Sequence, residues 1–109
     1  MGADSFIAFF GVRFELSEEE MELCETGDDD RIRRARKAKL DFCSDRATDG
    51  EKYFLYVGRS LADLLVEAGV YEKLSEAELI DVVSQTKTRL TQAEISGEPS
   101  LHFQLIAQY

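Results

Sequence analysis

The chain has 109 residues, of which 44 % are hydrophobic and 32 % are charged, with a single proline and a formal net charge of −9. A chain of this length forms one domain, residues 1–109, which can bury a core without metal or disulfide support. The composition excludes a disordered or low-complexity chain. The negative charge disfavours nucleic acid and anionic membranes as partners, because the summed field repels polyanions.

Two cysteines, Cys24 and Cys43, lie in unrelated contexts and form no CxxC pair, so we expect neither a disulfide framework nor a metal site, and no cofactor. The first residues lack the basic stretch and the cleavage motif of a signal peptide. No apolar run approaches the length of a membrane span. A cytoplasmic protein is therefore expected.

The first elements are predicted from alternation and from a helix cap. Every second residue is apolar over residues 6–16, which is typical of a half-buried strand. Ser17 and Glu20 have the spacing of a capping box, so a helix begins there. Gly27 interrupts this helix, and a second segment, capped by the three aspartates that follow, runs to about Lys39. We expect a broken helix.

A hairpin is predicted next, because an Asp-Gly pair at residues 49–50 separates two β-prone runs, 42–46 and 52–57. A two-residue turn fixes the register of the strands that flank it, with Arg46 opposite Tyr53. In the same register Phe42 lies opposite Val57 at the far ends of the two runs.

An insert follows the third strand at residues 60–73. Its apolar residues have helical spacing and predict a short helix: Leu61, Leu64, Leu65 and Ala68. The alternative continues the third strand through Gly58 as a bulge and leaves the segment up to Lys73 irregular.

A second capping box, Ser75 with Glu78, predicts a helix that ends near Ile95, and alternation over residues 101–109 predicts a last strand. The resulting order is strand, helix, strand, strand, helix, strand. This order is typical of a ferredoxin-like α+β fold, βαββαβ, in which two main helices pack on one face of an antiparallel sheet.

In that topology the first and third strands are central, and the sheet face away from the helices carries aromatic residues. An apolar open face needs a cover, which is either the insert, a protein partner or a second copy of the chain. RNA-recognition domains stack bases on such a face, but the acidic charge and the absence of their glycine-and-aromatic signature oppose RNA. The predicted interaction face consists of Phe9, Phe54, Tyr56, His102 and Ile106.

The charge is polarised along the chain. Six of the thirteen basic residues lie between Arg31 and Lys39, which leaves seven basic against twenty-two acidic residues elsewhere. Clustered arginines suit oxyanions, so the basic helix is a candidate site for an anion or for nucleic acid. The alternative is a solvated helix face paired with nearby acidic residues. The candidate anion-binding residues are Arg31, Arg33, Arg34 and Lys37.

Catalytic residues cannot be assigned from the sequence. His102 is the only histidine, and no nucleophile, phosphate-loop or dinucleotide motif is present. A small enzyme with a pocket between sheet and insert, in which His102 or Tyr56 acts as acid or base, is the third hypothesis. The sequence favours the first: a small acidic protein-interaction module that binds a protein partner or itself as a homodimer.

Overall fold

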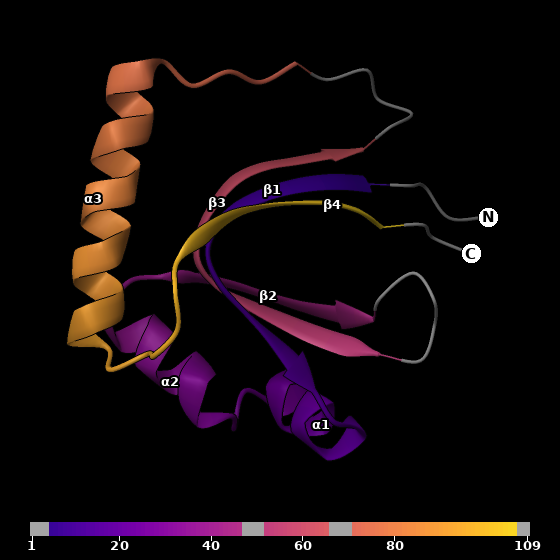
Figure 1. The fold of residues 1–109 in the computed structure, drawn as a ribbon. Coiled ribbons are helices and arrows are strands. Elements are labelled where there is room, and N and C mark those ends of the chain that lie inside the picture. The colour runs from indigo at the N-terminus through magenta and orange to yellow at the C-terminus, as the bar shows by residue number, and fades with distance from the viewer. Residues whose placement is uncertain (1–4, 47–51, 66–70, 107–109) are drawn as a thin grey trace.

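A four-stranded antiparallel sheet organises the structure, a computed structural model that describes residues 5–46, 52–65 and 71–106 (Figure 1). The strand order is β2-β3-β1-β4, so β1 and β3 are the central strands. The predicted α+β class is confirmed. In chain order the elements are β1 (Ser5–Leu16), α1 (Glu18–Thr26), α2 (Asp30–Lys37), β2 (Asp41–Arg46), β3 (Tyr53–Leu65), α3 (Glu76–Gln92) and β4 (Ser100–Ile106).

The sheet curves strongly, and the helices lie on its convex side (Figure 1). At the corner, Gly11 of β1 lies opposite Gly58 of β3. A Cβ atom on Gly11 would collide with the carbonyl oxygen of Val57, and one on Gly58 would collide with that of Phe10. Glycines in strands mark such corners, because only a residue without a side chain lets two backbones approach this closely.

Each face of the sheet carries an apolar cluster. On the concave face the buried residues are Ile7, Phe9, Phe54 and Tyr56. On the helix side, residues of β1 and β3 pack against α1, α2, the end of α3 and the residues that follow these helices: Val12, Leu16, Leu55, Val57, Cys24, Ile32, Ala35, Leu40, Leu90, Ala93 and Ile95. Each fully buried large apolar side chain stabilises the fold by about 1.5–3 kcal/mol relative to an exposed one.

The predicted helix starts and the predicted break are confirmed. Ser17 accepts a hydrogen bond from the backbone N–H of Glu20 at 3.1 Å, and the Glu20 carboxylate accepts one from the N–H of Ser17 at 3.0 Å. Ser75 caps α3 by accepting from the N–H of Glu78 at 3.1 Å. Gly27 ends α1 in the left-handed conformation, with φ 77°.

Helices α2 and α3 are each followed by a residue in the left-handed conformation, a position that glycine usually occupies. Lys39 (φ 60°) and Glu94 (φ 57°) are left-handed although neither is glycine. In both cases the backbone N–H of the next residue donates to the carbonyl oxygen five positions earlier, at 2.8 and 3.0 Å, as in a Schellman motif. The next residues, Leu40 and Ile95, are buried in the helix-side cluster, and this burial offsets the strain.

The predicted hairpin register is confirmed, with Arg46 paired to Tyr53 and Phe42 paired to Val57. The Asp-Gly turn at residues 49–50 lies outside the described residues. Register in this hairpin therefore follows from local sequence.

The helix predicted from Leu61 to Ala68 is wrong over the residues described. β3 continues through Gly58 to Leu65 and pairs with the first part of β1. The register shifts where Phe9 pairs with Ser60 and Ala8 pairs with Ala62, so Leu61 is the bulged residue. A strand forms there because the backbone of Ser5 to Ala8 would otherwise lack a partner on that side. Residues 71–75 have no regular structure, and residues 66–70 lie outside the described part.

The remaining differences concern ends of elements. α3 stops at Gln92 instead of near Ile95, and β4 is described as far as Ile106, so the predicted strand residues 107–109 lie outside the described part. None of the helices in the three described ranges combines the length and the apolar character needed to cross a membrane.

Gly11→Ala is expected to lower the free energy of unfolding by about 3 kcal/mol or more, because the new methyl group meets paired backbone. Gly27→Ala is the matched control, since its Cβ would first meet the flexible guanidinium of Arg36, and the expected loss of about 1 kcal/mol reflects the left-handed backbone alone. Urea titration measures both variants. Equal losses of stability in the two variants would contradict the close approach of β1 and β3 at Gly11.

Lys39→Gly is expected to stabilise the protein by about 1 kcal/mol, because glycine adopts the left-handed conformation without strain. Lys37→Gly, two residues earlier in the last turn of α2, is expected to destabilise by about 1 kcal/mol. Thermal and urea unfolding compare the two. A loss of stability in Lys39→Gly would contradict the conclusion that the left-handed conformation of Lys39 is strained.

Candidate functional site

The predicted aromatic interaction face is brought together by the fold, but it is not an exposed surface. Phe9 and Tyr56 are 2 % exposed and Phe54 is 0 % exposed. The ring centroids of Phe9 and Tyr56 lie 5.3 Å apart, and those of Phe54 and Tyr56 lie 5.1 Å apart. The corner at Gly11 lets these rings pack against one another, so the prediction of an open face is corrected to a second core. The side chain of Ile106 lies outside the described atoms.

The polar groups beside this cluster are engaged with the protein itself. The Tyr56 hydroxyl donates to Oε1 of Gln104 at 2.6 Å, and Nε2 of His102 lies 3.0 Å from the carbonyl oxygen of Gly11. Because a carbonyl oxygen only accepts, this bond holds a proton on Nε2 of His102. His102 and Tyr56, the residues that the enzyme hypothesis named as acid or base, therefore form hydrogen bonds that stabilise the concave side of the sheet. The guanidinium of Arg13 covers the cluster, 5.3 Å from the ring centre of Phe54.

Two of the four candidate anion-binding residues are paired with carboxylates. Arg31 contacts Glu20 at 2.9 Å and Asp29 at 3.0 Å. The hydrogen bond from Arg31 lowers the pKa of Asp29, and the same pairing raises the pKa of Arg31. Arg34 contacts Asp30 at 2.9 Å. For these two arginines the structure therefore agrees with the predicted alternative to an anion site, which is a helix face paired with nearby acidic residues.

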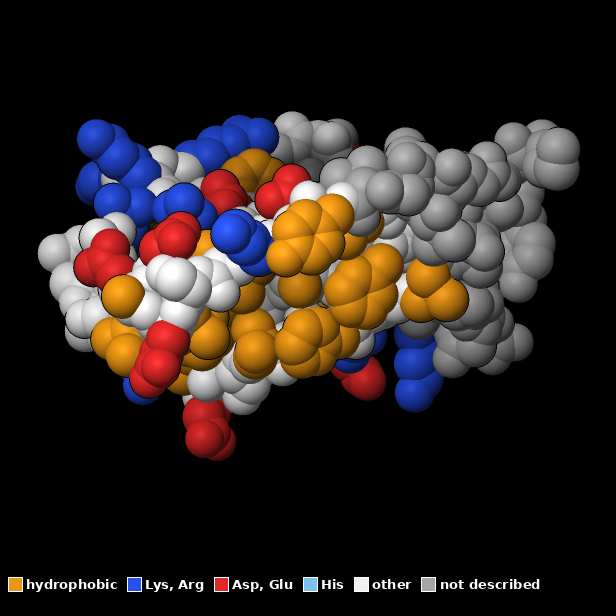
Figure 2. All heavy atoms as spheres, turned by 90° about the horizontal axis from the view of Figure 1, so that it is seen from above, with side chains coloured by type: hydrophobic (Ala, Val, Ile, Leu, Met, Phe, Trp, Pro, Cys, Tyr) orange, Lys and Arg blue, Asp and Glu red, His pale blue; other side chains and the backbone are white. Residues whose placement is uncertain are grey.

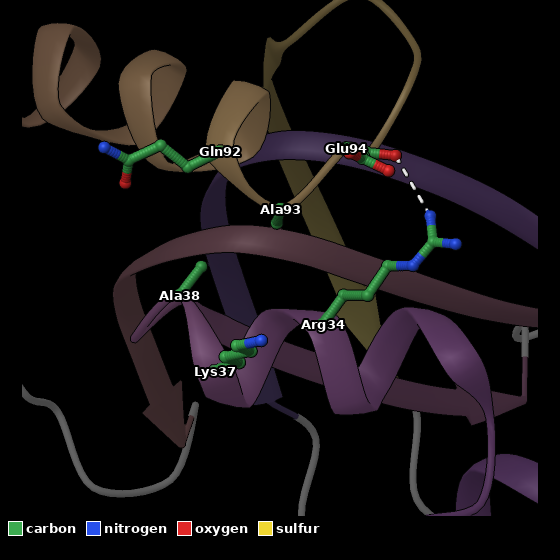
Figure 3. Close-up of a pocket in the computed structure, with 6 residues that line it drawn as sticks. All are labelled: Arg34, Lys37, Ala38, Gln92, Ala93 and Glu94. Atoms are coloured by element: carbon green, nitrogen blue, oxygen red, sulfur yellow. Dashed lines mark hydrogen bonds between the residues drawn. The ribbon is translucent and has the colours of Figure 1, made fainter.

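A hollow of about 400 Å³ lies between the end of α2 and the end of α3 (Figure 3). Its lining residues are Arg34, Lys37, Ala38, Gln92, Ala93 and Glu94. Arg34 reaches across it and donates to the backbone carbonyl oxygen of Glu94 at 3.2 Å. Two helix C-termini meet here, and their carbonyl groups carry partial negative charge that opposes an anion. Arg33 and Lys37 are exposed, and the carbonyl groups at the end of α2 work against the binding of a phosphate-like anion beside Lys37.

A second, apolar hollow of about 200 Å³ lies on the helix side of the sheet. Ala8 and Ala62 are paired across β1 and β3, and their small side chains leave this space. Around them stand Leu61, Leu79, Leu101 and Phe103, with Glu72 and Lys73 also in the lining. The hollow is thus formed between the sheet and the segment after the third strand, where the enzyme hypothesis expected a pocket. His102 and Tyr56 are not among its lining residues, since they belong to the opposite face.

An exposed row of large apolar side chains borders this hollow. Leu101, Phe103 and Leu105 of β4, hereafter the apolar strip, are 42 %, 62 % and 53 % exposed. Phe103 stacks on Phe6 of β1, with ring centroids 6.1 Å apart. Figure 2 looks down on this part of the molecule and shows hydrophobic side chains gathered in one stretch. The sequence contained the alternation that produces the strip, but it did not indicate that the helices leave these residues uncovered.

Among the described residues, no group of three or more His, Cys, Asp or Glu side chains is placed to hold a metal ion. Cys24 is a buried free thiol, and burial raises its pKa to about 11, so it stays protonated at neutral pH. Comparison of the chain with protein-family models, with curated proteins and with solved structures gives no match.

Asp29→Asn is expected to lower stability at neutral pH by about 2 kcal/mol, because the amide keeps the cap but loses the ionic bond to Arg31. The pKa of Asp29 is below 3.8 in the folded state, so this stabilisation is present above pH 3.8 and disappears as the pH falls through the folded pKa. Urea unfolding from neutral to acidic pH should therefore show the two proteins converging below pH 3.8.

Asp30→Asn provides the control, because the bridge from Asp30 to Arg34 is largely exposed and is expected to contribute less than about 0.5 kcal/mol. A difference between wild type and Asp29→Asn that persists unchanged at low pH would show that the charge of Asp29 is not the cause.

Proposed function

We propose that this chain is a small protein-interaction module that docks its partner through the apolar strip and the adjoining apolar hollow. The observation that carries the proposal is the exposure of three large apolar side chains in one row on an edge strand. Single exposed apolar residues are ordinary on protein surfaces, whereas a contiguous row beside a hollow has the composition of an interface core.

The arrangement around Phe103 supports the same proposal. Binding energy at protein interfaces is concentrated in a few anchors, and aromatic side chains that meet apolar pockets are prominent among them. Phe103 is 62 % exposed and borders the hollow above Ala8 and Ala62. A partner would cover this ring and fill the hollow in the same contact.

The other two functions predicted from the sequence have weaker support. An anion binder needs available cations, and Arg31 and Arg34 are paired with acidic residues. An enzyme needs convergent polar groups at a pocket, and the apolar hollow is lined mainly by leucine, alanine and phenylalanine.

Two finer assignments belong to the proposal. The fold is assigned to the ferredoxin-like type, which the strand order β2-β3-β1-β4 and the helices on one side of the sheet support. The cytoplasm is assigned as the location, because the buried Cys24 is a free thiol and a reducing compartment keeps it so.

Phe103→Asp is expected to reduce association with the partner at least about tenfold, because a carboxylate cannot be buried in an apolar contact. Chemical cross-linking of the tagged protein in an extract of its own cells, with quantification by mass spectrometry, measures this. Leu23→Asp is the matched control, since Leu23 is 47 % exposed on α1 and lies outside the strip. Circular dichroism and urea unfolding verify that both variants fold. Cross-linking that is the same in Phe103→Asp as in wild type would overturn the proposed function.

A further inference from the structure

The two edges of the sheet differ in charge. The edge formed by β2 and the second half of β3 carries Asp41, Asp45 and Arg59. The other edge, β4, contains no Asp, Glu, Lys, Arg or Pro from Ser100 to Ile106, although 32 % of the chain is charged. Charged residues and prolines are the means by which proteins block the pairing of edge strands with other chains. The sequence of β4 leaves its edge open to such pairing.

The sequence of β4 is also complementary to itself in the antiparallel direction. Phe103 is the midpoint of the strand. A two-fold axis at this residue would therefore pair β4 of one copy of the chain with β4 of a second copy over the whole length of the strand. Leu101 then lies opposite Leu105 of the other copy, and His102 lies opposite Gln104. From Leu101 to Leu105, apolar residues therefore lie opposite apolar ones and neutral polar residues opposite neutral polar ones, which is the arrangement that stabilises cross-strand pairs.

Such pairing would extend the apolar strip across the axis. Residues directly opposite one another in an antiparallel pair project from the same face, so the two Phe103 rings become neighbours with leucines on either side. Main-chain hydrogen bonds along the edge would supply affinity in addition to the apolar contact. An isologous contact of this kind closes at two copies, and the charged opposite edge discourages further addition of strands.

We propose that the occupant of the apolar strip is a second copy of this chain, bound by antiparallel pairing of β4 with β4 about a two-fold axis at Phe103. This inference rests on the proposed function, because it names the partner of the same surface. Each copy carries a net charge of −9, so two copies repel one another at long range. Added salt screens this repulsion and is expected to strengthen the dimer, which is the opposite of the behaviour of a basic partner.

The experiment combines mass measurement with a register-specific disulfide. Light scattering of the wild-type protein over a concentration series is expected to approach twice the chain mass of 12.4 kDa, at lower protein concentration when salt is added. Two variants, Leu101→Cys and Leu105→Cys, are prepared in a Cys43→Ser background, and both keep Phe103. Mixed and oxidised, they are expected to form a disulfide-linked pair, because opposite residues have Cα separations within the range of about 4.4–6.8 Å that a disulfide spans.

Each variant oxidised alone is the control. Two copies of Leu101→Cys would place their thiols four residues apart along the pairing, about 13 Å, which is too far for a disulfide. Cross-linking of either variant with itself, or equal cross-linking in all three samples, would overturn the proposed register. A wild-type mass that stays monomeric at every concentration would overturn the second copy as partner.

The two proposals fail in different ways. A monomeric wild-type protein leaves the proposed function intact if cross-links to other proteins depend on Phe103. Association that persists in Phe103→Asp, whether with itself or with another protein, removes the proposed function and this inference together. Circular dichroism of each cysteine variant confirms that it is folded, and the wild-type mass measurement does not depend on any variant.

Discussion

The close contact between Gly11 and Gly58 decides the shape on which the rest of the structure depends. Because a Cβ on either residue would collide with the facing strand, the backbones can approach only as glycines, and the sheet turns its corner there. Phe9 and Tyr56, on either side of the corner, then pack with their ring centroids 5.3 Å apart. Without this corner the concave face would present its aromatic side chains to solvent. One pair of glycines thus converts a potential aromatic surface into a second core.

The same curvature limits what the helices cover. The end of α3 and the turn after it reach the helix-side core through Leu90, Ala93 and Ile95. The rest of α3 stands beside the sheet (Figure 1), and Ile80 in its first half is 62 % exposed. Leu79 of α3 borders the hollow beside Leu101 and Phe103, but Leu101, Phe103 and Leu105 stay 42 %, 62 % and 53 % exposed although they lie on the helix side. The apolar strip is a consequence of where α3 meets the sheet.

Features set by neighbours in the sequence could be predicted, and features set by distant contacts could not. The cap of Ser17 on Glu20 and the pairing of Arg46 with Tyr53 involve short sequence separations. The segment from Leu61 to Leu65 has helical spacing, but its pairing with residues 5–8, more than fifty positions away, makes it part of β3. Outside residues 61–65, the face to which each strand residue belongs was predictable. Burial of the aromatic face, however, depends on the close contact of Gly11 with Gly58, which no local sequence pattern indicates.

Charge explains why a docking surface on this chain would be apolar instead of ionic. With a net charge of −9, two copies repel each other over most of their surfaces. The basic helix α2 does little to reverse this, because Arg31 is paired with Glu20 and Asp29, and Arg34 with Asp30. Repulsion is least where charged groups are absent, and β4 is such a place at the edge of the sheet. The acidic surface would then act by excluding other contacts, so that the apolar strip sets both the affinity of docking and its geometry.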